Sequence, residues 1–151
     1  TGGSSGYRCM CSMRHDGAAD MIRSATEADV MHVVDLVEDL RAAVDGLMPV
    51  NRPWTAAMVA QLIHSPEAVV LVSDGGFIAG SMQPTIINPA RVAMEHGWRA
   101  RDRSGMRLRR AVEEWAAEQG AVMVKLSTGA VGPDLGRLGY TMTEKTWVKG
   151  I

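Results

Sequence analysis

The sequence predicts an α/β (α+β) fold with a mixed, mostly antiparallel central sheet and helices on both of its faces. A β-branched run over Ala68–Ser73 leads into Asp74-Gly75-Gly76, which is a strong signal for a hairpin between antiparallel strands. Apolar residues recur at helical spacing in two other parts of the chain. The second of these helical patterns is followed directly by the apolar run 121–126, as expected for a helix that packs against a sheet.

The first elements are expected between residues 21 and 63. Residues 21–25 predict a short strand, after which Thr26 caps a helix that runs to about Val44. Residues 47–53 contain two prolines and predict a loop, and residues 54–63 predict a second helix. The apolar side of the first helix is set by its helical spacing: Val30, Val33, Val34, Val37 and Leu40.

The hairpin and the following strand form the centre of the predicted sheet. The partner of Ala68–Ser73 is expected over residues 77–87, with Pro84 bending it or placing it at an edge. Residues 91–98 contain the next strand.

The C-terminal third is expected to hold a helix, a turn and two strands. Ser104 or Gly105 opens a helix that ends at Gly120, with Leu108, Val112, Trp115 and Ala116 on its inner face. Residues 121–126 predict a buried strand, residues 132–138 a brief helical turn, and residues 140–148 the final strand.

Length and composition indicate one globular domain. The chain has 151 residues and 46% hydrophobic content, enough for a proper core over residues 21–151. Residues 1–20 are rich in Gly and Ser without periodicity, and they predict a flexible N-terminal extension left by cloning or by an upstream start. Cys9, Cys11 and His15 are one ligand short of a structural zinc site, so no metal is expected.

Charge and hydropathy argue against two classes of partner. The net charge of −1 makes a nucleic-acid partner unlikely, and no apolar run is long enough to span a bilayer, so no membrane partner is expected. The absence of a secretory h-region and the two closely spaced cysteines favour a cytoplasmic protein.

Basic charge is concentrated at one turn. Four arginines, Arg99, Arg101, Arg103 and Arg107, lie where a strand meets the helix that opens at Ser104 or Gly105. Backbone N–H groups and the positive end of a helix are suited to bind phosphate. This turn therefore predicts a site for a small, phosphorylated cofactor.

Three segments carry a family resemblance: the opening MIRSATEADV, the central RDRSGMRLRRAVEEWAAEQGA and the ending LGRLGY. Over residues 21–148 they resemble the GNAT family of N-acetyltransferases, and the phage and prophage members most of all. In that family the central turn reads Gln/Arg-x-x-Gly-x-Gly/Ala and wraps the pyrophosphate of acetyl-CoA. Two registers are open here: one places Asp102 and Ser104 at the glycine positions, and the other places Arg103 and Gly105 there.

The resemblance implies acetyl transfer from acetyl-CoA, as co-substrate, to a primary amine. A carboxylate general base is implied on the strand before the turn, and Glu95 is the candidate, with His96 as the alternative. If the strand alternates regularly, these two side chains face opposite sides of the sheet. The implied cofactor-binding residues are Trp98, Arg99, Ala100, Arg101, Arg103, Ser104, Gly105, Met106, Arg107, Ser127 and Thr128.

The remaining positions leave alternatives open. The tyrosine that serves the family as general acid corresponds to Leu135, and Tyr140 is expected in the core. Trp98 and Trp54, with the loop over residues 47–53, are candidates to line the acceptor site. The second hypothesis is a non-catalytic module that holds acyl-CoA or a protein partner. The acceptor, a small-molecule or peptide amine, and the oligomeric state, with a homodimer as one option, stay open.

Overall fold

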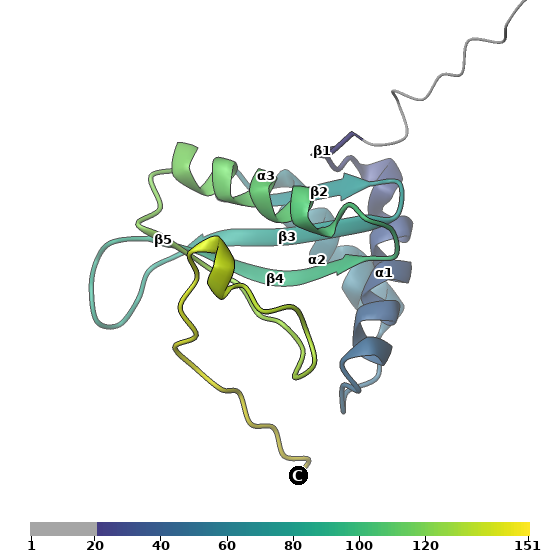
Figure 1. Cartoon of the computed structure of the whole chain (residues 1–151). Helices are drawn as coiled ribbons and strands as arrows, with labels where there is room; N and C mark the ends of the chain where they lie inside the picture. The colour runs from purple at the N-terminus through teal and green to yellow at the C-terminus, as the bar shows by residue number, and fades with distance from the viewer. Residues whose placement is uncertain (1–20) are drawn as a thin grey trace, which may run out of the picture.

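The computed structural model describes residues 21–151, and Figure 1 shows how their elements are arranged. The predicted N-terminal extension and the cysteine pair lie outside these residues. In chain order the elements are β1 (Arg23–Ser24), η1 (Glu27–Asp29), α1 (Val30–Ala43), α2 (Arg52–His64), β2 (Ala68–Ser73), β3 (Gly76–Gln83), β4 (Val92–Ala100), α3 (Gly105–Glu118), β5 (Met123–Lys125) and η2 (Gly136–Leu138).

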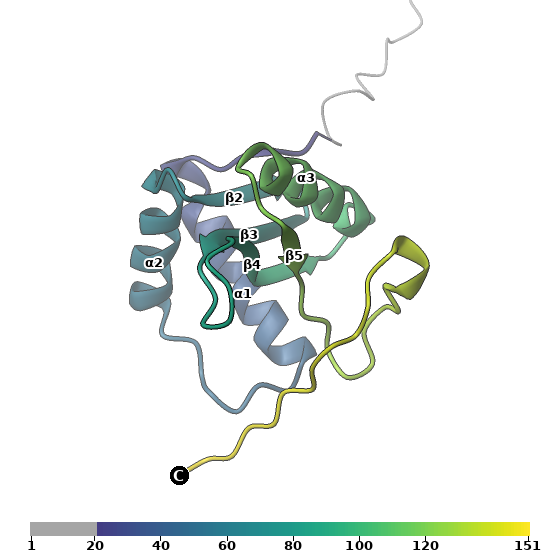
Figure 2. The ribbon, with the colours of Figure 1, turned by 90° about the vertical axis from the view of Figure 1, so that its left-hand side faces the viewer.

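Within residues 21–151 the strands form one sheet in the order β1-β2-β3-β4-β5. The first four strands are antiparallel neighbours, and β5 pairs with β4 in parallel. Helices α1 and α2 cover one face and α3 covers the other, as the two perpendicular views show (Figure 1 and Figure 2). The predicted fold class, a mostly antiparallel sheet between helices, is confirmed.

Alternation along β3 divides the core into two layers. Phe77 and Ala79 pack with α1 and α2, whereas Ile78 packs with Leu108 and Val112 of α3. Since successive side chains of a strand point to opposite faces and both faces are covered by helices, β3 is buried from Gly76 to Met82.

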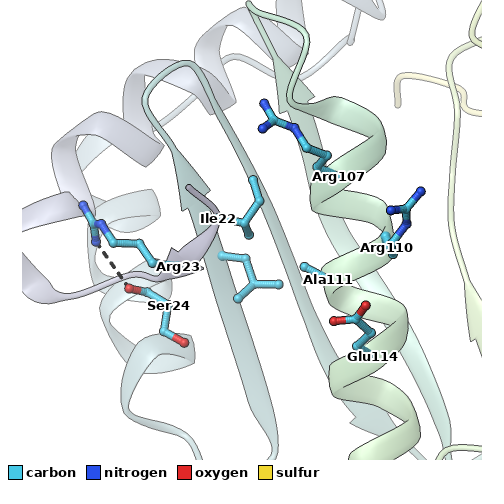
Figure 3. Close-up of a pocket in the computed structure, with 8 residues that line it drawn as sticks. Ile22, Arg23, Ser24, Arg107, Arg110, Ala111 and Glu114 are labelled. Atoms are coloured by element: carbon cyan, nitrogen blue, oxygen red, sulfur yellow. Dashed lines mark hydrogen bonds between the residues drawn. The ribbon is translucent and has the colours of Figure 1, made fainter. Parts of the chain in front are cut away.

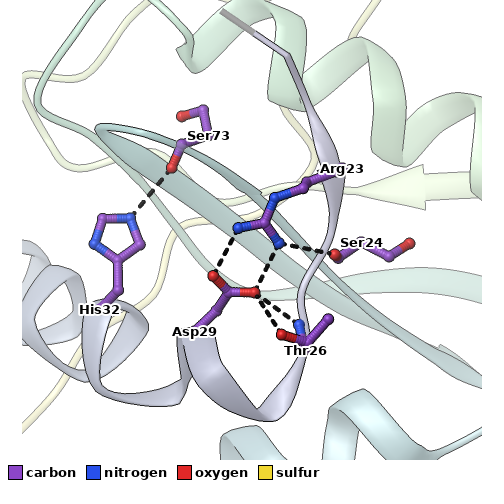
Figure 4. A network of polar contacts seen from close by, with 6 residues as sticks. All are labelled: Arg23, Ser24, Thr26, Asp29, His32 and Ser73. Carbon is purple, nitrogen blue, oxygen red and sulfur yellow. Dashed lines mark hydrogen bonds and ion pairs between the residues drawn. The ribbon is translucent and has the colours of Figure 1, made fainter. Parts of the chain in front are cut away.

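The start of the first helix is fixed by a polar network that ties it to β1 (Figure 4). Thr26 and Asp29 form a capping box, and Arg23 forms two hydrogen bonds of 2.7 and 2.8 Å with the Asp29 carboxylate. The bond from Arg23 holds the pKa of Asp29 well below its usual range. His32 Nε2 lies 3.2 Å from the Ser73 carbonyl oxygen and adds a contact to β2.

Two predicted boundaries differ from the structure because of proline. Helix α2 begins at Arg52, not at Trp54: Asn51 accepts a hydrogen bond from the Trp54 N–H, and Pro53 is tolerated in the first turn. Strand β3 ends at Gln83 instead of reaching Ile87, because Pro84 has no N–H to continue the ladder.

The C-terminal strands were predicted less well. Strand β5 is short and only partly buried: Met123 is 59% exposed, whereas Val124 packs against the core beside Ala116. Residues 140–148 form no strand, so that prediction is wrong. They run away from the sheet, as the yellow trace in Figure 1 shows, and Trp147 is 88% exposed. Without a neighbouring strand, β propensity alone does not make a ladder.

Helix α3 matches its prediction closely. It spans Gly105–Glu118, its inner face carries Leu108, Val112 and Ala116, and Trp115 is partly buried against the same core. Gly120 follows with a φ of 78°, the left-handed conformation expected just after a helix. In residues 21–151 no helix is both long and apolar enough to cross a membrane.

Candidate functional site

Strand β4 is irregular at His96. Ala79 of β3 is paired with Gly97, but the next residue, Gly80, is paired with Glu95, so His96 is the extra residue of a β-bulge. The strands approach closely here, since a Cβ at Gly80 would lie 3.1 Å from the Met94 carbonyl oxygen. A bulge re-aims side chains, and this one separates the directions of Glu95 and His96.

Beyond the bulge, β4 loses its other neighbour. The parallel pairing with β5 covers Val92 to Met94 and stops, while β4 continues to Ala100. The edge of β4 from Glu95 onward therefore has no strand partner among the described residues. Such an edge can pair with an extended ligand.

Glu95 lies where the two strands separate. Its Oε2 accepts a hydrogen bond of 2.9 Å from the Ser127 N–H, just after β5. Burial raises the pKa of Glu95, and the bond from Ser127 opposes part of that rise. A carboxylate with a raised pKa is suited to take up and release protons near neutral pH.

His96 lies on the opposite face from Glu95, at the bulge and not in a regularly alternating part of β4. Its Nε2 is 2.6 Å from Ser81 Oγ, and Gln83 Nε2 donates a 2.9 Å hydrogen bond to the same oxygen. Ser81 is two residues after Ala79, so it shares the α1/α2 face. Although the residue as a whole is exposed, partial burial of the imidazole lowers the pKa of His96. No motif or spacing in the sequence singles out Ser81 or Gln83.

The turn before α3 contains its own anion. Asp102 Oδ1 accepts hydrogen bonds from the Ser104 N–H, at 2.9 Å, and from the Ser104 hydroxyl, and the latter is the main reason that the pKa of Asp102 is lowered. Ser104 is fully buried, with its Oγ 2.7 Å from Ser73 Oγ. The buried serine pair holds the turn against the β2–β3 hairpin.

The four arginines of the turn do not converge. Arg101 bonds through Nε to Asp39 of α1, and that bond lowers the pKa of Asp39. The Nε of Arg99 is buried without a partner among residues 21–151. Arg103 is exposed and makes no hydrogen bond or ion pair within the described chain, so it is the guanidinium most available to a ligand.

The fourth arginine, Arg107, lines a separate groove between β1 and α3 (Figure 3). The groove has a volume of about 410 Å³. Figure 3 shows Arg107 and Arg110 on successive turns of α3, with Ile22 across from them. The lining residues are Ile22, Arg23, Ser24, Leu71, Arg107, Arg110, Ala111 and Glu114.

The other predicted site residues fall into two groups. Trp98 and Ala100 pack on the α3 side, where Trp98 Nε1 donates to the Gly105 carbonyl oxygen at 3.2 Å. Met106 is partly exposed at the start of α3, and Thr128 is exposed in the loop after β5. Trp54 is 67% exposed on α2, across the sheet from Trp98, so the two tryptophans do not line one pocket.

Tyr140 is half-buried, and its hydroxyl group makes polar contacts. Its hydroxyl donates to Glu113 Oε1, which also accepts from the buried Arg109 of α3. Burial raises the pKa of Tyr140 to about 12, with Glu113 adding to the effect. The ring therefore ties the segment after η2 to α3 and keeps its proton at neutral pH.

Solved structures share this fold. A transcriptional regulator from Bacillus halodurans superposes with a TM-score of 0.69 at 19% identity, covering 87% of this chain and 99% of its own. A GNAT family acetyltransferase from Staphylococcus aureus gives 0.61 at 14% identity, covering 87% and 98%. An aminoglycoside acetyltransferase from an uncultured soil metagenomic sample, solved in complex with sisomicin, gives 0.57 at 14% identity, covering 87% and 93%.

Several further acetyltransferases superpose similarly, so the fold is that of the GNAT acetyltransferases. The identities are low, and the likeness concerns the fold alone. No family model and no curated protein matches the chain.

Proposed function

We propose that this protein is a GNAT-family enzyme, of the phage and prophage type, that transfers an acetyl group from acetyl-CoA to a primary amine. The observation that carries the proposal is the partly buried carboxylate of Glu95 at the point where β4 separates from β5. A carboxylate at this point, beside a strand edge without a strand partner among the described residues, supports a role as proton acceptor. The fold shared with acetyltransferases supports the same reading.

The residues around the diverging strands fit an acyl-CoA. An amide-containing arm can form hydrogen bonds with the free edge of β4 beyond Met94, as an added strand does. The N–H groups of Gly105 and Met106 precede the first hydrogen bond of α3, which runs from the Leu108 N–H to the Ser104 carbonyl oxygen, so they are available to a diphosphate. Arg103 supplies an exposed positive charge beside them.

Glu95 is the proposed general base. The amine acceptor is protonated in water and attacks a thioester only after it loses a proton, which Glu95 accepts directly or through a water. His96 is less suited, because its Nε2 is already in contact with Ser81 on the other face of β4. The transfer then forms an amide bond and releases the thiol of CoA.

The acceptor side is proposed to lie on the α1/α2 face. The exposed Trp54 and the loop before α2 offer an aromatic and open surface there. One structural neighbour is described as an aminoglycoside acetyltransferase, so polyamino sugars are a reasonable first class of acceptor to test.

A second candidate function is a non-catalytic module that binds a partner without turnover. Asp102 favours it, since its ionised carboxylate lies at the start of α3 and repels a diphosphate. Binding without release of thiol, in the presence of a broad panel of amines, would support this alternative.

The test is release of free CoA thiol from acetyl-CoA with a panel of aminoglycosides, small amines and peptides. The parent is expected to turn over, and Glu95→Gln to lose about 10²–10⁴-fold in kcat. Glu67→Gln, which changes an exposed glutamate paired with Arg91, is the matched control and should keep full activity. Equal activity of Glu95→Gln and the parent would remove Glu95 as the base.

A further inference from the structure

A chain of three polar side chains crosses from β3 to β4 without involving the proposed base. Gln83 Nε2 donates to Ser81 Oγ at 2.9 Å, and Ser81 Oγ lies 2.6 Å from His96 Nε2. Ser81 is 7% exposed, whereas His96 is exposed. The buried hydroxyl of Ser81 therefore links the partly buried Gln83 to a ring that a ligand can reach.

The donor and the acceptor of each of these hydrogen bonds follow from counting the available hydrogen atoms. The amide nitrogen of Gln83 can only donate, so it takes up a lone pair of Ser81 Oγ. The single hydroxyl hydrogen of Ser81 then has His96 Nε2 as its acceptor. If Nε2 carried the proton instead, the Ser81 hydrogen would be buried without an acceptor, which is unfavourable.

In this arrangement of donors and acceptors, a neutral His96 ring carries its proton on Nδ1. Partial burial lowers the pKa of His96, which agrees with a neutral ring at physiological pH. The exposed side of the ring then presents an N–H donor, not a lone pair. The ring is a poor base in this state and a good hydrogen-bond donor.

We propose that Gln83 and Ser81 are positioning residues that hold His96 in its Nδ1–H tautomer, and that His96 donates this N–H to an oxygen atom of the amine acceptor. The inference rests on the proposed acetyl transfer and specifies its acceptor: an amine with a hydroxyl or carbonyl oxygen nearby. Glu95 and His96 lie on opposite faces, but β4 has no strand neighbour beyond Met94. A ligand at that open edge can contact both side chains.

The tautomer is tested directly by ¹⁵N NMR of the histidine rings, assigned with His96→Gln. The parent is expected to show a protonated Nδ1 and an unprotonated Nε2 at His96. Ser81→Ala should shift the ring toward the other tautomer, and Ser81→Thr, which keeps the hydroxyl, should restore the parent signals. A protonated Nε2 in the parent would overturn the proposal whether or not the protein has acetyltransferase activity.

Kinetics test the role at the acceptor. Ser81→Ala and Gln83→Leu are expected to raise the KM for an oxygen-bearing amine about three- to tenfold while kcat stays within about twofold, as the loss of one oriented hydrogen bond predicts. For a simple alkylamine without such an oxygen the KM should not change. Equal effects on both amines would contradict donation from His96.

Two controls separate this role from others. Thr85→Ala removes hydrogen bonds to Asn88 in the loop after β3, and it should leave the His96 signals and both KM values unchanged.

Intact-mass spectra after incubation with acetyl-CoA should show no acetyl group on Ser81. A turnover-competent acetyl-Ser81 would make Ser81 a nucleophile and overturn the positioning role. Loss of all turnover in the parent, with the expected tautomer, would instead count against the proposed function.

Discussion

Replacement of Asp102 by Asn should strengthen the binding of acetyl-CoA. The Asp102 carboxylate accepts hydrogen bonds from the Ser104 N–H and hydroxyl at the start of α3, and its lowered pKa keeps it ionised at neutral pH. Its negative charge lies beside the backbone donors that a diphosphate would use. Asn removes the charge and keeps an oxygen that accepts the Ser104 N–H.

The size of the effect follows from Coulomb's law. At a distance of about 6 Å and a water-like dielectric, one pair of unit charges repels by about 0.7 kcal/mol, so two charges of a diphosphate give about 1.4 kcal/mol. That corresponds to about a tenfold lower Kd for Asp102→Asn at low salt. Screening at about 1 M salt, where the Debye length is about 3 Å, should remove most of the gain.

Isothermal titration calorimetry at two salt concentrations measures this difference. Asp134→Asn is the matched control, because Asp134 also accepts the N–H two residues later, from Gly136 at 2.8 Å, but it lies before η2 rather than α3. It should leave the Kd unchanged. Unchanged or weaker binding by Asp102→Asn at low salt, with the fold intact, would refute the placement of the diphosphate at this turn.

Three further predictions concern stability and pH. Gly97→Ala should destabilise the protein by roughly 1–3 kcal/mol in urea unfolding, since its Cβ would lie 3.0 Å from the buried ring of Phe77. Asp29→Asn should lower the free energy of unfolding by roughly 1 kcal/mol at pH 7, because it loses its bond to Arg23. Since the pKa of Asp29 is lowered in the folded state, this difference in stability is present above the unfolded pKa of about 4. It should vanish as the pH falls through the folded pKa. The raised pKa of Glu95 predicts that kcat/KM rises with pH through a pKa above the usual glutamate value, and that Glu95→Gln abolishes this limb without lowering the unfolding free energy at neutral pH.

The central elements were predictable because local signals and tertiary context agree there. The Asp74-Gly75-Gly76 turn fixed the β2–β3 hairpin, and Ser73 pairs with Gly76 as such a turn requires. The apolar spacing of α3 identified its buried face correctly. Both signals lie within short stretches of sequence, so they can be recognised without knowledge of the rest of the fold.

The C-terminal segment failed for the opposite reason. Residues 140–148 carry strand-forming side chains, but a strand needs a neighbour, and none of the described strands pairs with them. The same dependence explains why β5 is short, because its pairing with β4 covers only three residues of each strand.

The position of the candidate site could be predicted from the sequence, but the strand pairing that shapes it could not. Glu95 could be singled out because it precedes the basic turn, and its predicted opposition to His96 agrees with their contacts to Ser127 and Ser81. The bulge that makes His96 the extra residue depends on pairing between β3 and β4, which leaves no trace in a single sequence.

The four arginines of the turn show the same limit of prediction from sequence. Charge density at the turn suggested that all four face one ligand. In the structure Arg101 bonds to Asp39, 62 positions away in the chain, and Arg107 lines the groove beside β1. Long-range partners of this kind decide where a guanidinium points, and composition cannot supply them.

The most direct test of the account is calorimetric titration of acetyl-CoA into the parent protein and Arg103→Ala. The account predicts a Kd on the order of 10 μM for the parent and weaker binding for Arg103→Ala, whose guanidinium is exposed at the turn. The absence of binding heat from a folded parent at up to about 1 mM acetyl-CoA would contradict the central claim. The protein would then have the acetyltransferase fold without its cofactor.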